Sequence, residues 1–404
     1  MNEKPHRPLA HGDVSDLPPV SPTGPRLRIA VLCRQASVRG GGAERYALAL
    51  VEQLAPNHDI HVFAQHIEHD APGVQYHRIA QPLHRPRWIN QLWFALATAW
   101  ATRRGFDVVH SHEMSWHGQV QTVHVLPVRY TLFQGLQGTA RVLRWIKVLT
   151  SPRLLTYLAL ERARFGGTGP RCVVLTSDTL LAQTRAAYPH CRWPMPVITP
   201  GVDRVCGPAS PALRAQARTL LGLPEAGSCV LMVANDARRK GLGTLIEALA
   251  QLPAPAYVAL VGNPAQRAQW LPTLQSSGLQ DRVFFLGSAV DVSVAYTAAD
   301  VLAHPTREDT FGMVVLEAMA HGVPVVVSAA PWCGMATLLT HGVHALVLPD
   351  PHDAAALADA LRRLLRDAPL RHQLQRAGHS LAQQHLWQQQ ARAQEALYRE
   401  LSAG

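Results

Sequence analysis

The chain has 404 residues, of which 48% are hydrophobic and 16% are charged, and its formal net charge at pH 7 is +10. This length predicts two domains that each bury a core, and the apolar content excludes a largely disordered protein. No run of about 18 apolar residues occurs, so the sequence predicts no transmembrane helix. The six cysteines are scattered without metal-ligand spacing, which indicates reduced core thiols of a cytosolic protein.

The positive charge is concentrated in one half of the chain. Residues 1–200 contain 22 Lys+Arg against 12 Asp+Glu, whereas residues 201–404 contain 16 of each kind. This asymmetry indicates an anionic partner for the first half, such as membrane lipid, a phosphorylated glycan or nucleic acid, although a basic surface can also simply aid solubility. No RNA- or DNA-binding motif is present and aromatic residues make up only 6%, so we expect no nucleic-acid partner.

The first 26 residues are polar and proline-rich and lack the apolar core of a signal peptide, so we expect a disordered leader. Strands and helices then alternate, which predicts a doubly wound parallel sheet over residues 27–202. We expect its strands at 28–33, 60–64, 107–111 and 172–176, and its first helices at 43–54 and 93–104.

A glycine-rich turn, residues 40–44, joins the first strand to the first helix. Gly41 and Gly42 allow backbone N–H groups to approach a ligand closely at a helix N-terminus. The turn lacks the full GxGxxG pattern and an acid placed for a nicotinamide ribose, which disfavours a dehydrogenase.

Histidines gather after the strand at 107–111, in the segment HSHEMSWH (residues 110–117), with His124 beyond it. The end of a strand in an open α/β sheet is where ligands bind, so His112 and His117 are candidate site residues. A packing or surface role is the alternative for any one of them. The spacing lacks the partner acids or helical periodicity that would make a zinc site persuasive.

Residues 139–165 combine leucines and tryptophan with Arg141, Arg144 and Lys147, and predict one or two basic amphipathic helices. Such helices can lie in the headgroup layer of an anionic membrane with their apolar face down. Alternatively, these helices cover the sheet and their arginines are solvated.

A second strand–helix alternation covers residues 203–383. We expect strands at 228–234, 257–262, 282–286 and 300–303, and terminal helices at 357–365 and 373–401. A basic turn, Arg238-Arg239-Lys240-Gly241, directly follows the first of these strands. Arg239 and Lys240 can neutralise a departing diphosphate, Arg by a fork and Lys as a point charge. A solvated basic turn is the alternative.

Residues 304–328 read as a polar loop, a helix that Gly312 opens, and a buried β-branched strand. Unpaired N–H groups and the positive dipole end of such a helix suit a phosphate. Asp309 and Glu317 bracket the helix start, and a carboxylate at Glu317 can accept hydrogen bonds from a ribose diol. An ordinary amphipathic helix with solvated acids is the alternative.

This last segment resembles the nucleotide-sugar signature of family 4 of the retaining glycosyltransferases. The resemblance rests on an acid and a Glu with seven residues between them, the FG pair at 311–312, LEAMA at 316–320 and PVV at 324–326. It covers residues 28–400 and is strongest from 228 to 350. The first acid of the family is Glu, whereas Asp309, one methylene shorter, stands here after Glu308.

The resemblance implies a GT-B fold, α/β, with two Rossmann-like domains that face each other across a cleft and a last helix, residues 384–404, that returns to the first domain. It implies that Arg239, Lys240 and His112 serve the reaction, with His112 near the transferred sugar. The adjacent RKG is similar to that of bacterial lipopolysaccharide core glucosyltransferases. The implied donor-binding residues are Gly41, Gly42, Gly287, Asp309, Phe311, Gly312, Met313, Val314 and Glu317.

The implied function is a retaining, metal-independent transfer of a hexose by front-face displacement, without a cofactor. We expect glucose to move from UDP-glucose to a lipopolysaccharide core or another lipid-linked glycan, at the cytoplasmic face of the inner membrane. Alternatives are another donor or anionic acceptor within the family, a nucleotide-sugar epimerase or a phosphorylase on the same fold, and a non-catalytic protein that binds anionic surfaces.

Overall fold

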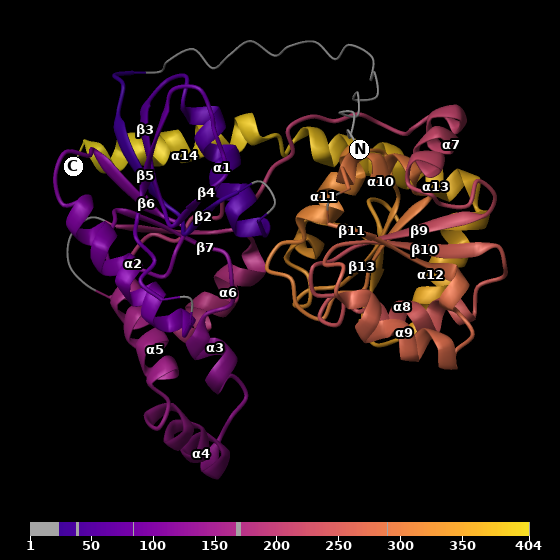
Figure 1. Cartoon of the computed structure of the whole chain (residues 1–404), viewed down its shortest axis with the longest axis horizontal. Coiled ribbons are helices and arrows are strands. Elements are labelled where there is room, and N and C mark those ends of the chain that lie inside the picture. The colour runs from indigo at the N-terminus through magenta and orange to yellow at the C-terminus, as the bar shows by residue number, and fades with distance from the viewer. Residues whose placement is uncertain (1–23, 38–39, 84, 167–170, 289, 404) are drawn as a thin grey trace, which may run out of the picture.

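The computed structural model describes residues 24–403 except 38–39, 84, 167–170 and 289. Most of the leader expected at residues 1–26 therefore lies outside the described residues. The described chain forms two domains, each built on a six-stranded parallel sheet with helices on both faces (Figure 1). The predicted fold class, two Rossmann-like doubly wound α/β domains, is confirmed.

The first sheet has the strand order β5-β3-β1-β6-β7-β8, and all neighbouring strands are parallel. The order in which strands are added to the sheet reverses between β1 and β6, which pair in parallel, Ile29 with Val108. Ligands of open α/β sheets bind beyond the carboxyl ends of the strands at such a point. The strands are β1 (Arg28–Leu32), β3 (Asp59–Ala64), β5 (Val74–Arg78), β6 (Val108–Ser111), β7 (Val120–Val123) and β8 (Cys172–Leu175), and β2 (Gln35–Ala36) pairs separately with β4 (His66–Ile67).

The second sheet repeats this topology with the order β11-β10-β9-β12-β13-β14. Its reversal point lies between β9 and β12, where Leu231 pairs with Leu302. Both sheets therefore carry a ligand-binding switch point at their carboxyl ends. The strands are β9 (Ser228–Val233), β10 (Ala256–Val261), β11 (Val283–Gly287), β12 (Val301–His304), β13 (Val325–Ser328) and β14 (Leu346–Leu348).

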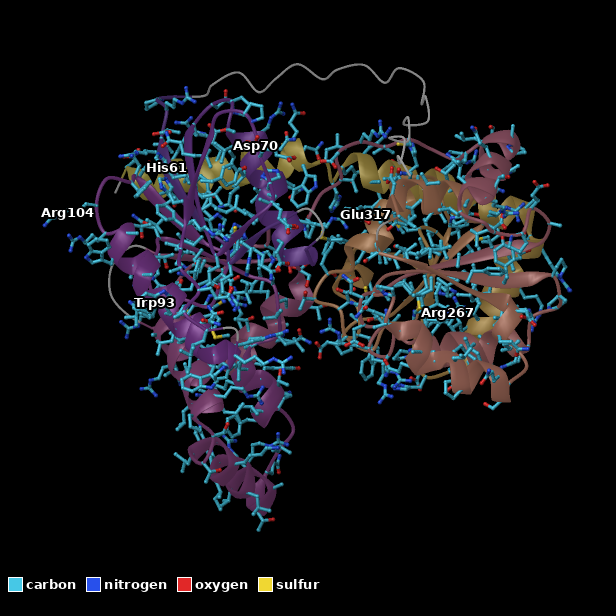
Figure 2. All side chains as sticks on the ribbon, viewed as in Figure 1. His61, Asp70, Trp93, Arg104, Arg267 and Glu317 are labelled. Atoms are coloured by element: carbon cyan, nitrogen blue, oxygen red, sulfur yellow. The ribbon has the colours of Figure 1, made fainter. Side chains whose placement is uncertain are left out.

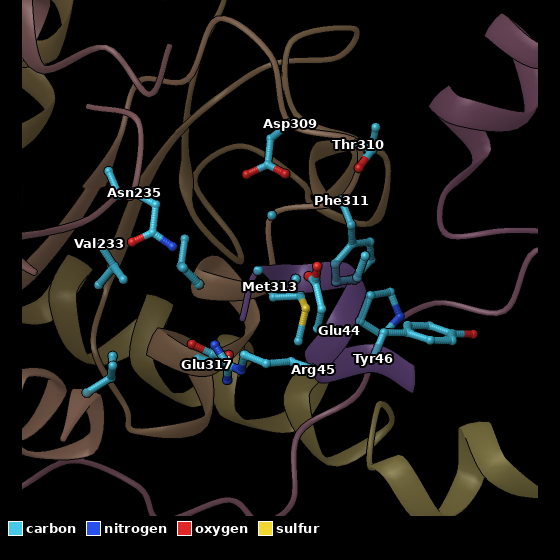
Figure 3. Close-up of a pocket in the computed structure, with 18 of the residues that line it drawn as sticks. Glu44, Arg45, Tyr46, Val233, Asn235, Asp309, Thr310, Phe311, Met313 and Glu317 are labelled. Atoms are coloured by element: carbon cyan, nitrogen blue, oxygen red, sulfur yellow. The ribbon is translucent and has the colours of Figure 1, made fainter. Parts of the chain in front are cut away.

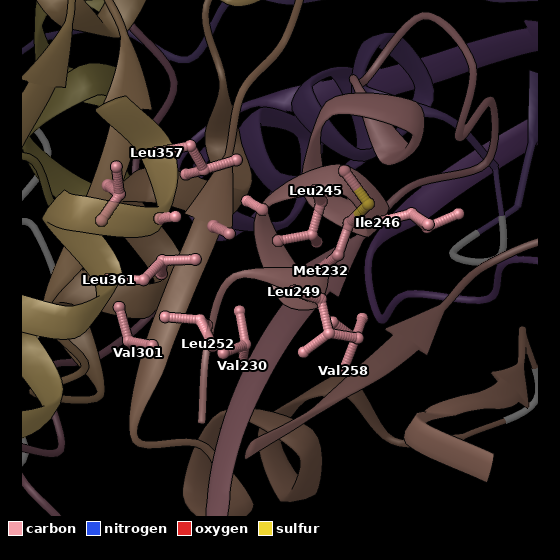
Figure 4. Packing of buried hydrophobic residues seen from close by; sticks show 14 of the residues in the cluster. Val230, Met232, Leu245, Ile246, Leu249, Leu252, Val258, Val301, Leu357 and Leu361 are labelled. Atoms are coloured by element: carbon pink, nitrogen blue, oxygen red, sulfur yellow. The ribbon is translucent and has the colours of Figure 1, made fainter. Parts of the chain in front are cut away.

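Alternate residues of β9 explain why helices cover both faces of the second sheet. Val230 and Met232 point into one core, shown in Figure 4, whereas Cys229 and Leu231 point into the core on the opposite face. Strands buried on both sides are apolar throughout, as this strand is. The helices of this domain are α7 (Pro211–Leu220), α8 (Leu242–Ala250), α9 (Gln266–Ser276), α10 (Val292–Ala298), α11 (Met313–Ala320), α12 (Ala354–Arg366) and α13 (Ala368–Gln383), with short turns η1 (Gln280–Arg282) and η2 (Gly334–Leu338).

The first domain has a similar layered core and an additional helical arm. Figure 1 shows α4 at the far end of this arm, away from the sheet. Val148 is the one buried residue of α4, and it packs with Leu132 and Leu154 in a small separate cluster. The helices of this domain are α1 (Gly42–Leu54), α2 (Arg87–Ala101), α3 (Val128–Phe133), α4 (Gly138–Leu149), α5 (Pro152–Phe165) and α6 (Asp178–Ala187).

The last helix, α14 (Trp387–Ser402), crosses from the second domain and packs on the first. Its Trp387 and Tyr398 are buried in the core that contains α1. At the crossing, Val202 N donates to His385 O (2.9 Å) and Trp387 N donates to Val202 O (3.0 Å). The chain thus passes between the domains twice at one place.

Several predicted element boundaries were wrong. The helix expected at 93–104 begins six residues earlier, at Arg87. Pro86, whose backbone is extended, is its N-cap residue. The segment 139–165, predicted as one or two helices, is two, since the Ser151 hydroxyl caps a new helix by accepting from Leu154 N. The segment 373–401 is also two helices, α13 and α14. Strands β5 and β7 were not predicted, because they carry polar residues such as Gln75 and Gln121.

No helix in the described part of the chain is both long enough and apolar enough to span a bilayer. All six cysteines are free thiols, and burial raises the pKa of Cys172 and of Cys229 to about 12. These thiols therefore stay protonated at neutral pH and serve as small packing groups.

Candidate active site

A cavity of about 1130 Å³ lies between the two domains, at the carboxyl ends of both sheets. Its walls are the glycine turn before α1, the crossover at Pro200–Arg204, the loop after β9 and the segment from Glu308 to Glu317. Figure 3 shows side chains of both domains converging on this space. The volume exceeds that of a typical small-ligand pocket, so it has room for a ligand with several parts.

The N-terminus of α11 opens onto this cavity as predicted. Gly312 precedes the helix in the left-handed region (φ +99°), and a Cβ at this position would lie 2.8 Å from the Cys333 sulfur, so only glycine fits. A Cβ built on Gly42 would lie 3.5 Å from the Met313 sulfur. The glycine turn of the first domain therefore meets the start of the helix in the second.

The basic turn after β9 is packed against the loop that precedes α11. Gly241 begins α8 in the left-handed region (φ +84°), and a Cβ there would lie 2.0 Å from the Pro305 carbonyl oxygen. Arg307 N also donates to the Arg239 carbonyl (2.9 Å). The two loops therefore form one wall of the cavity, which carries both Arg239 and Lys240.

Asp309 holds Lys240 in place. The Lys240 ammonium lies 2.5 Å from Asp309 Oδ2 and donates to the Glu308 carbonyl (3.3 Å), and His304 Nε2 also contacts Asp309 Oδ2 (3.0 Å). Burial raises the pKa of the Asp309 carboxyl, but the Lys240 charge and the His304 hydrogen bond outweigh burial and hold it well below its ordinary value. Since an ammonium has three donors, one donor of Lys240 remains for a ligand.

Arg239 is also paired, but more loosely. Its Nη1 donates to Glu308 Oε1 (3.2 Å), and both side chains are about half exposed, at 49% and 43%. An exposed pair of this kind contributes little to stability, so a ligand phosphate can take the place of the Glu308 carboxylate at low cost.

The Glu317 carboxylate is held at both of its oxygens, by Arg45 and by Tyr296. Arg45 Nη2 lies 2.5 Å from Glu317 Oε1, and the Tyr296 hydroxyl donates to Oε2 (2.7 Å). Figure 3 shows the Arg45 side chain reaching from α1 to this carboxylate. Burial, and then the Glu317 charge, raise the pKa of Tyr296 well above its ordinary value, so Tyr296 remains a donor at neutral pH.

His110, His112 and His124 form a buried stack of rings and not a binding site separate from the cavity. The rings of His110 and His112 lie 4.1 Å apart between centroids, and His112 Nδ1 lies 3.0 Å from His124 Nε2. Burial lowers the pKa of His112 to about 3, and burial likewise lowers those of His110 and His124 well below the ordinary value. All three imidazoles are therefore neutral at physiological pH.

The hydrogen bond between His112 and His124 identifies their tautomers. His112 Nε2 is buried and has no partner among the described residues. A buried N–H without an acceptor costs more than a buried acceptor without a donor. We therefore assign the proton of His112 to Nδ1, which donates to His124 Nε2, and the proton of His124 to its own Nδ1.

The structure brings ten of the twelve predicted site residues to the cavity wall. His112 is not among the residues that line it, and His124, which stacks in front of His112, lines it instead. Gly287 ends β11 but also does not line the cavity, whereas the next residue, Ser288, does. The ten that line it are Gly41, Gly42, Arg239, Lys240, Asp309, Phe311, Gly312, Met313, Val314 and Glu317.

Three further residues that line the cavity were not predicted as site residues: Arg45, Tyr296 and Thr310. Arg45 directly follows the glycine turn, and this position was the only available signal for it. Tyr296 lies on α10, where no motif marks it. Among the described residues, no group of three or more His, Cys, Asp or Glu side chains is arranged to hold a metal ion.

Comparisons with known proteins agree with this geometry. The family model Glycosyltransferase Family 4 matches residues 40–205, and the model Glycosyl transferases group 1 matches residues 214–380. The crystal structure of WaaG, a glycosyltransferase involved in lipopolysaccharide biosynthesis, superposes with a TM-score of 0.79 at 22% identity, over 93% of this chain and 100% of that chain. This confirms the predicted GT-B fold.

Two curated relatives match over part of their length. The lipopolysaccharide glucosyltransferase WaaG of Escherichia coli is 31% identical over 229 residues, which are 55% of this chain and 60% of the relative. A D-inositol 3-phosphate glycosyltransferase of Salinispora tropica is 36% identical over 244 residues, 54% of this chain and 50% of the relative. The chain thus spans about half to three-fifths of these relatives. Because the two family models together cover most of the chain and the fold agrees, the chain belongs to the GT-B glycosyltransferases related to family 4.

Proposed function

We propose that this protein is a retaining hexosyltransferase that moves glucose from UDP-glucose to a lipid-linked glycan, for which the lipopolysaccharide core is the first candidate. The observation that carries the proposal is the meeting of three groups on one cavity: the N-terminus of α11, the Arg239–Lys240 turn and the Glu317 carboxylate. A nucleotide sugar presents a diphosphate and a ribose diol, which need cations with N–H donors and a carboxylate acceptor respectively.

In this proposal, the donor binds along the side of the cavity that the second domain forms. Its diphosphate lies at the start of α11, where Lys240 has one donor left and Arg239 is only loosely held by Glu308. Its ribose lies deeper, at Glu317, whose two oxygens are oriented by Arg45 and Tyr296. The sugar then lies toward the first domain, where His124 lines the cavity.

In the proposed reaction, the bond between the sugar C1 and the β-phosphate oxygen breaks as a bond from the acceptor oxygen to C1 forms on the same face. The acceptor proton passes to the departing diphosphate oxygen. Arg239, Lys240 and the N-terminus of α11 stabilise the negative charge that develops there. This route requires neither a protein nucleophile nor a metal ion, and no cofactor takes part.

The acceptor is proposed to be anionic and attached to a membrane lipid. Residues 71–106 and 114–160 contain ten Lys and Arg and no Asp or Glu. Only Val148 of α4 is buried, so the alternative that the helices of residues 139–165 cover the sheet is wrong for α4. It holds for the end of α5, where Phe165 packs with Val123 and Val173 of the sheet. α4 instead exposes an apolar set beside Arg141, Arg144 and Lys147, which suits the headgroup layer of an anionic membrane. The exposed set is Val142, Leu143, Trp145, Ile146 and Leu149.

A second candidate acceptor is a soluble inositol phosphate. The observation that favours it is the 36% identity to a D-inositol 3-phosphate glycosyltransferase. This acceptor is also anionic, so the basic first domain suits both candidates. The outward apolar face of α4 favours the lipid-linked acceptor, because a soluble acceptor requires no membrane contact.

The test is a transfer assay with the purified full chain. UDP-glucose, UDP-galactose and GDP-mannose are each incubated with truncated lipopolysaccharide core and with inositol 3-phosphate, and NMR reports the anomeric configuration of the product. We expect UDP release from UDP-glucose and an α-linked product on the lipopolysaccharide core. An inverted linkage would refute the retaining mechanism. Binding of an oligonucleotide without binding of any nucleotide sugar would refute the enzyme proposal.

A further inference from the structure

Thr310 forms two hydrogen bonds that join the domains within the cavity wall. Its hydroxyl donates to the His124 carbonyl (2.7 Å), and its own carbonyl accepts from the Ser177 hydroxyl (2.6 Å). Thr310 belongs to the second domain, whereas His124 and Ser177 belong to the first. One residue of the donor-side loop therefore contacts two separate loops of the opposite sheet.

Both partners lie on rigid parts of the first domain. His124 directly follows β7, and Ser177 lies two residues beyond the end of β8. The Ser177 hydroxyl also caps α6 by accepting from Leu180 N (3.1 Å). The two hydrogen bonds therefore fix Thr310 relative to the first sheet, because neither His124 nor Ser177 lies on a long loop.

Thr310 is equally well fixed on its own side. It lies between Asp309, which holds Lys240, and Phe311, which is buried. A Cβ built on Gly334 would lie 2.1 Å from the Thr310 carbonyl oxygen and 2.6 Å from the Ser177 hydroxyl. The absence of a side chain at Gly334 therefore allows the close approach of Thr310 and Ser177.

We propose that Thr310 is a positioning residue that places His124 of the first domain against the donor groups of the second. Its hydroxyl acts on the backbone of His124, while His112 orients the ring of the same residue through the Nδ1–Nε2 hydrogen bond. The inference rests on the proposed function, since it assumes that a sugar lies between His124 and the Asp309–Lys240 pair. Small displacements of such groups are enough to slow a transfer reaction.

The test compares Thr310→Val, which keeps the bulk and removes the hydroxyl, with Thr310→Ser, which keeps the hydroxyl. Thr98→Val is the matched control, because it removes a buried hydroxyl that bonds to the Phe94 carbonyl within α2. Thr310→Val should lower kcat by roughly 10- to 100-fold and leave the UDP Kd within about two-fold. Thr310→Ser should restore kcat, and Thr98→Val should match the wild type.

Two results would overturn the inference: unchanged kcat in Thr310→Val, or a UDP affinity that falls in parallel with kcat, which would make Thr310 a donor-binding residue. A second measurement does not depend on activity. Spin labels on unnatural residues at positions 104 and 267, which are exposed on the first and the second domain respectively (Figure 2), report the distance between the domains. Thr310→Val should broaden this distance distribution, and Thr310→Ser should not.

The two measurements also separate the inference from the proposed function. A wild-type chain that transfers no sugar to any acceptor would refute the proposed function. The distance distribution would then decide on Thr310 by itself: a distribution in Thr310→Val identical to that of the wild type would overturn the positioning role, and a broader one would support it.

Discussion

The Arg45 guanidinium of the first domain lies 2.5 Å from the Glu317 carboxylate of the second, measured from Nη2 to Oε1. The two residues are separated by 272 positions in the sequence. Coulombic attraction by Glu317 is the largest cause of the raised pKa of Arg45. With the Tyr296 hydroxyl on Oε2, this contact fixes how Glu317 faces the cavity. A carboxylate held in this way is preorganised to accept hydrogen bonds from a ligand.

Replacement of Glu317 should therefore weaken donor binding. In Glu317→Ala, loss of a charged hydrogen bond to the ribose should reduce UDP affinity by roughly 1.5–3 kcal/mol. Isothermal titration calorimetry with UDP measures this directly. Glu247→Ala, an exposed acid on α8, is the matched control and should bind UDP as the wild type does. An unchanged UDP affinity in Glu317→Ala would refute the ribose role.

Replacement of Lys240 should affect turnover more than donor binding. The Lys240 ammonium pairs with the charge that develops on the departing diphosphate, and one such contact is worth about 10²–10³ in rate. Steady-state kinetics of Lys240→Ala should show this loss in kcat. Arg238→Ala is the control, because Arg238 is exposed on the same turn and does not line the cavity. A kcat of Lys240→Ala within a few-fold of the wild type would remove Lys240 from the site.

Chelators should leave transfer intact. The proposed counter-charges for the diphosphate are Arg239, Lys240 and the helix N-terminus, so no divalent cation is required. The rate with excess EDTA should stay within about two-fold of the rate without it. Loss of activity in EDTA that Mg²⁺ or Mn²⁺ restores would contradict this prediction.

The first domain should bind anionic vesicles in a salt-dependent manner. Each cation near an anionic surface contributes about 1 kcal/mol, so glutamine at Arg141, Arg144 and Lys147 should weaken binding by about 100-fold. Liposome flotation measures this, and about 1 M salt should screen the wild-type interaction.

The matched control for vesicle binding replaces three exposed cations of the second domain, Arg267, Arg363 and Arg366, in the same way. This variant should float with anionic vesicles as the wild type does. Equal binding of the wild type to neutral and anionic vesicles, or binding that is indifferent to salt, would contradict the electrostatic prediction.

Stability should fall steeply below pH 6.5. Burial lowers the folded-state pKa of His110, His112 and His124, in the case of His112 from 6.5 to about 3. The unfolded chain therefore binds protons below pH 6.5 that the folded chain does not, and the stability present above this pH is lost as the pH falls. Because the folded-state pKa of His112 is about 3, His112 should cost about 1.4 kcal/mol at about pH 5.5, and His110 and His124 should lower the stability further in the same direction.

Urea unfolding at about pH 7.5 and about pH 5.5 checks this stability prediction. His112→Gln removes one of the three titrating groups, so the difference in unfolding free energy between the two pH values should shrink by about 1.4 kcal/mol. An identical difference in the wild type and in His112→Gln would contradict the assignment of His112 as a buried neutral base.

The sequence by itself determined the fold class and most of one wall of the cavity. The glycine turn, the Arg239–Lys240 turn and the segment from Asp309 to Glu317 are each contiguous, and each lies on the carboxyl side of a buried strand, β1, β9 and β12 respectively. Since carboxyl ends of parallel strands meet at one edge of a sheet, the local motifs were enough to place the Arg239–Lys240 turn beside the segment from Asp309 to Glu317, which follow β9 and β12 of the same sheet. Element boundaries were less predictable, because caps such as Ser151 and polar strands such as β7 give weak local signals.

Only the tertiary structure decided which side chains meet across the cavity. Arg45 reaches Glu317, Thr310 reaches His124, and His124 rather than His112 lines the cavity. These contacts depend on how the two domains face each other and on which ring of a buried stack lies in front. The distance between remote segments and the order in which they pack decide these contacts. These two properties leave no periodicity or spacing in the sequence.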